Sequence, residues 1–138
     1  MSKCIVVGTF PLGHENTILY GNLDSSGGYF NLMPKSNGQP QVFVGFRNDK
    51  WPEIVSVLLH ETMEVLMLRA GVAYHPIGCL SESCQDRVFT FSHVQFDEMC
   101  EKQAFFLAQA LPQLHKYWKE QQRKWKKNKR NAPKGGAR

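Results

Sequence analysis

Three ionisable side chains stand within an apolar run near the middle of the chain. His60, Glu61 and Glu64 lie in the stretch 57–66, whose other residues are mostly Val, Leu and Met. A helix turns about 100° per residue, so His60 and Glu64 project from one face, a turn apart. An imidazole and a carboxylate so placed can bind one metal ion. Glu61 beside them can take a proton from a metal-bound water.

A second His and carboxylate pair has the same spacing later in the chain. Ser92 and Gln95 fit a capping box, which predicts a helix that begins at His93. His93 and Asp97 would then also lie one turn apart. If the two helices face each other, the pairs form a mixed nitrogen and oxygen site that suits zinc, with manganese or iron as alternatives. The expected ligands are His60, Glu64, His93 and Asp97.

The same residues also have a simpler interpretation. Glu53, Ser56, His60 and Glu64 follow one another at helical spacing and could form the solvated face of one helix. An acid in a first helical turn, such as Asp97, is ordinary because it favours the helix dipole. A metal site and a solvated helix face therefore both stay open at this point.

The segment 59–64, Leu-His-Glu-Thr-Met-Glu, resembles the HExxH helix of zincin metallopeptidases. Glu64 stands where the family has its second histidine, so the resemblance supports metal binding more than proteolysis. It implies His60 as a ligand and Glu61 as the general base. It also implies a third ligand on the later helix, for which we expect His93.

Two wider features accompany this motif. The apolar segment 41–46 precedes the helix, where zincins have an edge strand. The whole chain, with short strands, a His-Glu helix and a basic end, resembles the short accessory proteins that phages encode.

Charge is divided unevenly along the chain. Residues 116–138 contain ten Lys or Arg and one acid, whereas residues 1–115 contain seven Lys or Arg and eleven acids. A basic arm on an acidic body favours binding of polyanions such as nucleic acid. Trp118 and Trp125 share one helical face, where they could stack on bases or pack on the body or on a partner. The expected nucleic-acid-binding residues are Lys119, Arg123, Lys124, Trp125, Lys126, Lys127, Lys129 and Arg130.

The four cysteines, Cys4, Cys79, Cys84 and Cys100, include no CxxC pair, which argues against a zinc ribbon or a thioredoxin-type site. His75 with Cys79 and Cys84 could form a second, loosely spaced zinc site. Free thiols in a reducing compartment are the alternative.

Other classes find no support in the sequence. There is no Gly-x-Ser-x-Gly elbow, no phosphate-binding GK[ST] loop and no apolar run of transmembrane length. Residues 1–8 are too strand-like for a signal peptide. We therefore expect no membrane partner and a cytoplasmic location, the host cytoplasm if the protein is viral.

The pattern predicts an α+β fold with one domain at 1–115, followed by a basic helical extension and disordered tail at 116–138. We expect an antiparallel sheet of four to five strands packed by two main helices. The expected strands are 4–10, 17–23, 29–33, 41–46 and 87–91, and the expected helices are about 52–70 and from 93 onward.

Two functions follow from these features. The first is a metal-binding, zincin-like protein, whose enzymatic form would be a metal-dependent hydrolase that uses an activated water. The alternative is a non-enzymatic accessory protein that binds nucleic acid or a host protein through its basic arm. A metal-bearing scaffold that inhibits a host factor would combine the two.

Overall fold

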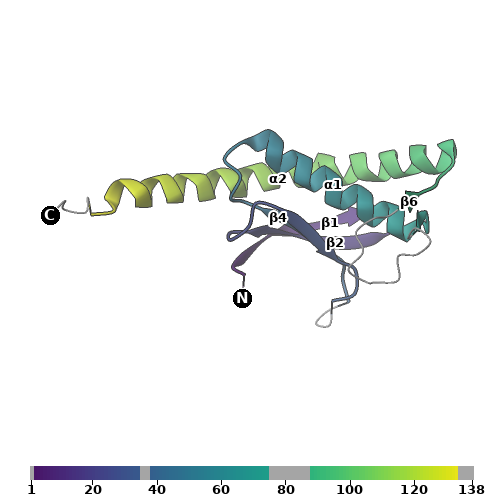
Figure 1. The fold of residues 1–138 in the computed structure, drawn as a ribbon, viewed down its shortest axis with the longest axis horizontal. Coiled ribbons are helices and arrows are strands. Elements are labelled where there is room, and N and C mark those ends of the chain that lie inside the picture. The colour runs from purple at the N-terminus through teal and green to yellow at the C-terminus, as the bar shows by residue number, and fades with distance from the viewer. Residues whose placement is uncertain (1, 35–37, 75–87, 134–138) are drawn as a thin grey trace.

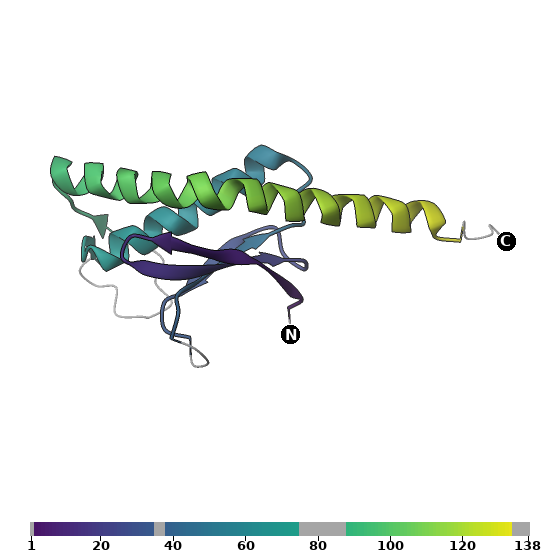
Figure 2. The same ribbon diagram turned by 180° about the vertical axis from the view of Figure 1, so that it is seen from behind.

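The computed structural model describes residues 2–34, 38–74 and 88–133. Its body is a four-stranded sheet with two long helices on one face (Figures 1 and 2). The predicted α+β class with two main helices is confirmed. Within the described ranges, none of the helices combines the length and apolar character needed to cross a membrane.

The sheet mixes parallel and antiparallel pairing, with the strand order β1-β2-β4-β3. β1 (Cys4–Leu12) and β2 (Glu15–Asn22) form an antiparallel hairpin whose turn contains Gly13, at a left-handed φ of 66°. β4 (Gln41–Gly45) is parallel to β2 and antiparallel to the edge strand β3 (Gly28–Asn31).

The predicted antiparallel sheet is therefore wrong in one pairing, because β2 and β4 are parallel. After β2 the chain passes to the far edge, forms β3 and returns to fill the place beside β2. Backbone bonds hold this crossover, because the Phe46 N–H donates to the Asn22 carbonyl at 2.8 Å and the Gly45 N–H to the Gly27 carbonyl at 2.7 Å. The strand that precedes the His-Glu helix is thus inside the sheet, whereas the zincin resemblance implies an edge strand.

The fifth strand expected at 87–91 is shorter than predicted and lies outside the main sheet. β5 (Ala73–Tyr74) and β6 (Val88–Phe89) pair with each other in a separate two-stranded sheet. They lead the chain from the first helix to the second.

Helix α1 (Trp51–Arg69) carries the His-Glu motif. Its N-cap is Lys50, and Pro52 occupies the first turn, where its missing N–H removes no helical bond. The helix ends at Arg69 with Ala70 as its C-cap, and Gly71 follows with a left-handed φ of 69°.

Helix α2 (His93–Asn131) begins where the capping box predicts. The Gln95 N–H donates to the Ser92 hydroxyl, and the Ser92 N–H donates to the Gln95 side chain. The helix continues unbroken past residue 115, so the expected end of the body falls inside it. Its C-terminal part, yellow in Figure 1, extends beyond the sheet.

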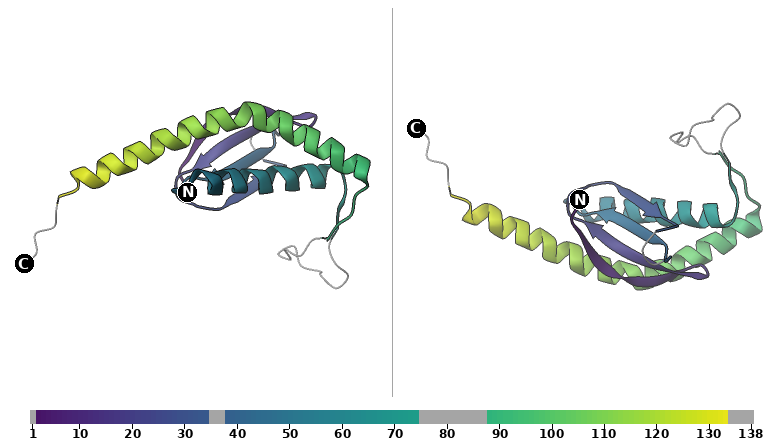
Figure 3. Two further views of the ribbon diagram at one scale, coloured as in Figure 1. Left: turned by 90° about the horizontal axis from the view of Figure 1, so that it is seen from above. Right: turned by 90° about the horizontal axis from the view of Figure 1, so that it is seen from below.

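The core lies between the sheet and the two helices, which run side by side above it (Figure 3). Alternate residues of β2 and β4 point into this layer, as the two-residue period of a strand requires. Fully buried members are Leu19, Val42, Val44, Phe46, Ile54, Leu58, Phe106, Ala110 and Leu114. This packing fixes how α1 and α2 are rotated, and so decides where their polar residues point.

Candidate functional site

The first predicted ligand pair lies on the outer side of α1. His60 Nε2 is 3.4 Å from Glu64 Oε2, and the His60 side chain is 72% exposed. This side is set by packing, because Ile54, Leu58 and Val65 occupy the opposite face in the core. The predicted i,i+4 spacing does bring the two side chains together, and they form a pair at the surface.

The second pair lies on the first turns of α2. His93 Nε2 is 3.4 Å from Asp97 Oδ2, and the His93 side chain is 87% exposed. The capping box places these residues at the free end of the helix, ahead of its first buried residue, Met99. Neither side chain points into the core.

A polar link between the helices shows that the two pairs do not face each other. The Gln103 side-chain amide donates to the Leu59 carbonyl and to the Thr62 hydroxyl, both at 3.0 Å. His60 projects about 160° round the axis from Thr62, away from α2, and His93 lies about 15 Å up its helix from Gln103. Four ligands around one ion are not brought together. In the three ranges that the structure describes, no three His, Cys, Asp or Glu side chains gather in a metal-holding group.

The side chain of Glu61, the expected general base, lies between α1 and the edge strand β3. It is only 7% exposed, and a Cβ placed on Gly28 of β3 would lie 3.0 Å from its Oε1. Burial raises the pKa of Glu61, the neighbouring His60 lowers it, and Glu64 raises it further. A raised pKa suits a proton acceptor at neutral pH. The burial of Glu61 beneath β3 separates it from the solvent side where His60 points.

The loop residues of the second predicted zinc site, His75, Cys79 and Cys84, lie outside the described part of the chain. Cys100 and Cys4 are half-buried free thiols. Cys100 follows the buried Met99 on α2.

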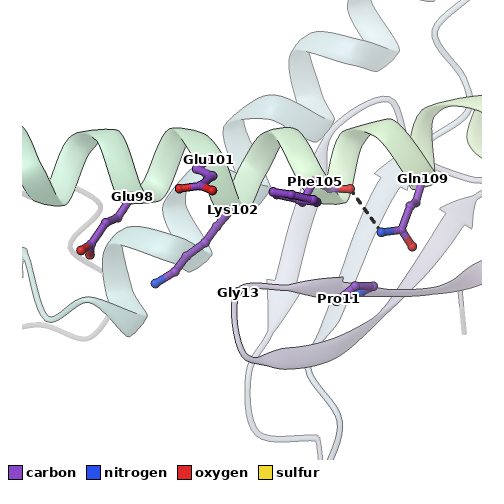
Figure 4. A pocket seen from close by; sticks show the side chains of 7 residues that line it. All are labelled: Pro11, Gly13, Glu98, Glu101, Lys102, Phe105 and Gln109. Carbon is purple, nitrogen blue, oxygen red and sulfur yellow. Dashed lines mark hydrogen bonds between the residues drawn. The ribbon is translucent and has the colours of Figure 1, made fainter.

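A surface pocket of about 390 Å³ lies where the tip of the β1–β2 hairpin meets α2 (Figure 4). Pro11 and Phe105 provide its apolar lining, while Glu98, Glu101 and Lys102 provide charged groups. The sequence did not indicate this pocket, because its two sides are about ninety residues apart in the chain.

The basic end of α2 is fastened to the body by a row of three side chains on one helical face. The Trp118 indole N–H donates to the Asn48 carbonyl at 3.0 Å, and Trp118 is 8% exposed. The Gln122 amide donates to the Phe46 carbonyl at 3.0 Å and to the Asn48 carbonyl at 3.3 Å. We call Trp118, Gln122 and Trp125 the anchor row.

Trp125, the expected base-stacking residue, completes the anchor row. The Arg47 guanidinium lies 4.7 Å from its ring centroid, and the ring is half-buried. One ring face is therefore occupied by a cation of the body. Both tryptophans follow the packing alternative that the sequence left open.

The predicted basic residues lie away from the body. Lys119, Arg123, Lys124, Lys126, Lys127, Lys129 and Arg130 are all exposed. Lys116, which was not among the expected binding residues, is exposed as well and shares a helical face with Lys119, Arg123, Lys126, Lys127 and Arg130. The spacing of three and four residues from Lys116 to Arg130 is the signal that could have included it.

A second feature that the sequence reading missed is an aromatic row on the helix-free face of the sheet. The Tyr20 and Phe43 rings stack with centroids 4.7 Å apart, and the Phe43 and Tyr29 rings at 4.2 Å. Val6 extends the row on β1, since it pairs with Tyr20 in the sheet register. The alternation of Tyr20 and Phe43 with buried neighbours was the available signal.

Comparison of the chain with protein-family models, with curated proteins and with solved structures gave no match.

Proposed function

We propose that this protein binds nucleic acid through the exposed basic end of α2. The observation that carries the proposal is the placement of that end. Seven Lys or Arg from Lys119 to Arg130 are exposed on a helix that extends beyond the sheet (Figures 1 and 2).

Electrostatics supports a polyanionic partner. Residues 116–138 have ten basic residues and one acid, while residues 1–115 have four more acids than basic residues. Lys and Arg that neutralise phosphates release condensed counterions, which provides most of the affinity of sequence-independent binding. The acidic body would be repelled by the same polyanion, so contact is directed to the arm.

The anchor row supports the proposal from the other side of the helix. It fixes the start of the arm against residues 46–48, so the basic side chains are presented from a fixed backbone. A helix that is already ordered loses less conformational entropy on binding than a disordered tail does.

The test uses the full-length chain and a variant in which the seven basic residues from Lys119 to Arg130 are replaced by Gln. Glutamine keeps helix propensity close to that of lysine and arginine, so circular dichroism should be unchanged. Fluorescence anisotropy with a labelled nucleic acid should show salt-dependent binding by the wild type and none by the variant. Equal binding by the two proteins would overturn the proposal.

Metal binding at the His60–Glu64 pair is a second proposal, supported by the 3.4 Å between His60 Nε2 and Glu64 Oε2. The pair provides two ligands, one fewer than catalytic zinc sites use. The geometry thus supports metal binding less strongly than nucleic-acid binding, and it supports no hydrolytic step.

Metal analysis of untagged protein tests this second proposal. Stoichiometric zinc in the wild type, lost in His60→Ala, is the expected result, together with a lower midpoint of unfolding when a chelator is added. Metal-free wild-type protein whose unfolding is unaffected by the chelator would exclude it. His60→Ala should leave nucleic-acid binding intact, which separates the two proposals.

A further inference from the structure

We propose that the arm binds the sugar–phosphate backbone of double-stranded nucleic acid, along one stripe of basic side chains and without reading the bases. This inference rests on the proposed nucleic-acid-binding function and names its substrate class. We call the stripe the basic stripe. Its members are Lys116, Lys119, Arg123, Lys126, Lys127 and Arg130.

Helix geometry places these six residues together. At about 100° per residue they fall within an arc of about 100°, and from first to last they span about 21 Å of the axis. All six are exposed. Lys124 and Lys129 are also exposed but project about 105–115° from the middle of the arc, so they lie outside the stripe.

The aromatic side chains that could stack on the bases of a single strand lie on a different face of α2 from the basic stripe. Binding of single-stranded nucleic acid relies on bases that stack on aromatic rings. The two tryptophans of the arm belong to the anchor row. Trp118 is buried with its indole N–H bonded to the Asn48 carbonyl, and Trp125 packs against Arg47. The basic stripe itself contains only Lys and Arg.

A duplex suits this surface better than the other polyanions do. A duplex carries one negative charge for about every 1.7 Å of its axis and has a major groove wide enough for a helix. A straight row of cations can meet several of its phosphates without a change in either partner. A membrane surface would require an apolar face for insertion, and the non-basic face of the arm is fastened to the body up to Trp125.

The expected binding follows from the number of charges. Six phosphate contacts give a slope of log K against log salt concentration of roughly −5, at about −0.9 per contact on duplex DNA. Removing two stripe cations should reduce the steepness of that slope by roughly 2. Removing two cations outside the stripe should leave the slope nearly unchanged.

Two double variants of the full-length chain make the matched comparison. Lys119→Gln with Lys126→Gln removes two stripe lysines, and Lys124→Gln with Lys129→Gln removes two lysines outside it. Both lower the net charge by two and make the same chemical change. Anisotropy of a labelled duplex of about 24 base pairs, titrated between about 50 and 200 mM salt, measures affinity and slope.

The expected result is a weaker affinity and a shallower slope for the stripe variant alone, and duplexes of unrelated sequence bound equally well. Equal losses in the two variants, tighter binding of a single strand of the same length, or equal binding of polyglutamate would overturn the inference while leaving an arm that binds polyanions. No binding of any nucleic acid by the wild type would overturn the proposed function itself.

Discussion

The contacts of the anchor row predict a graded series of stability losses when they are removed one at a time. Trp118 is 8% exposed and packs against Trp51, with ring centroids 5.5 Å apart. Trp118→Ala removes a buried indole and should lower the free energy of unfolding by about 3–5 kcal/mol. Trp118→Phe keeps most of the ring and loses one hydrogen bond. It should cost about 1 kcal/mol beyond the lost ring area, because the Asn48 carbonyl keeps the Gln122 amide as a donor at 3.3 Å.

The loss in free energy of unfolding should be smaller for contacts nearer the tip of the arm. Gln122→Ala removes two partly buried hydrogen bonds to the Phe46 and Asn48 carbonyls and should cost about 1–2 kcal/mol. Arg47→Ala removes the cation over the Trp125 ring at a more exposed site, which should cost about 0.5–1 kcal/mol. The order of the three positions tests the contacts more strictly than any single value does.

Urea unfolding followed by circular dichroism gives these differences, with the slope against denaturant checked for a constant value. Hydrogen exchange of the amides from 118 to 131 gives an independent measure, since loss of an anchor should speed exchange on the arm before it affects the sheet. Lys124→Ala, an exposed change on the same segment, is the control and should shift stability by less than about 0.5 kcal/mol. A Trp118→Ala variant whose free energy of unfolding falls by less than about 1 kcal/mol would refute this anchoring.

Three further predictions concern α1. Burial raises the pKa of Glu61, so the contribution of this carboxyl to stability is largest below the ordinary pKa of 4.5 and is lost as pH rises through the folded-state pKa. Glu61→Gln should therefore become more stable relative to wild type as pH increases from 4.5 to 7. Identical pH profiles of unfolding free energy for the two proteins would contradict this. Gly28→Ala would place a Cβ 2.6 Å from a valine methyl of α1 and should cost about 1–3 kcal/mol in urea unfolding, whereas Gly27→Ala, whose Cβ would meet nothing closer than the Ser25 hydroxyl at 3.9 Å, should cost far less. Thr62→Val and Gln103→Met each remove the hydrogen bond that joins them, so a double-mutant cycle should show a coupling of about 0.5–1 kcal/mol, and strict additivity would contradict that bond.

Local signals predicted the helices well. The start of α2 follows from Ser92 and Gln95, because a capping box satisfies specific N–H groups within four residues of sequence. The end of α1 follows from Gly71, which adopts the left-handed conformation that glycine accepts without strain. These features depend on neighbouring residues alone, so one sequence is enough to find them.

Strand pairing could not be read in the same way. The alternation in 41–46 predicts a strand but does not name its neighbours, and β4 pairs in parallel with β2 across a crossover that contains β3. Turn-forming residues at 24–28 and 34–38 favour antiparallel pairing of consecutive strands, which is what we expected. The correct order depends on backbone bonds between residues about twenty apart, such as that from Phe46 to Asn22.

The arrangement of the candidate ligands could be predicted only in part, for a related reason. Helical spacing correctly placed His60 beside Glu64 and His93 beside Asp97. The rotation of α1 was not predictable, because apolar residues lie nearly all round it. In the structure Glu61 and Thr62 are buried while Leu59 is exposed, which is the reverse of what hydrophobicity alone suggests.

If the arm binds duplexes as proposed, the unbroken course of α2 has a consequence for how many molecules can occupy one duplex. At 1.5 Å per residue its 39 residues span about 58 Å. Because this one helix both packs in the core and carries the basic arm, a molecule bound through the arm would hold its acidic body at a fixed position relative to the phosphates. Adjacent bodies with the same sign of charge repel each other over a Debye length of about 8–10 Å. Lateral repulsion of this kind predicts anticooperative occupancy, with widely spaced molecules and a binding isotherm that broadens as salt is lowered.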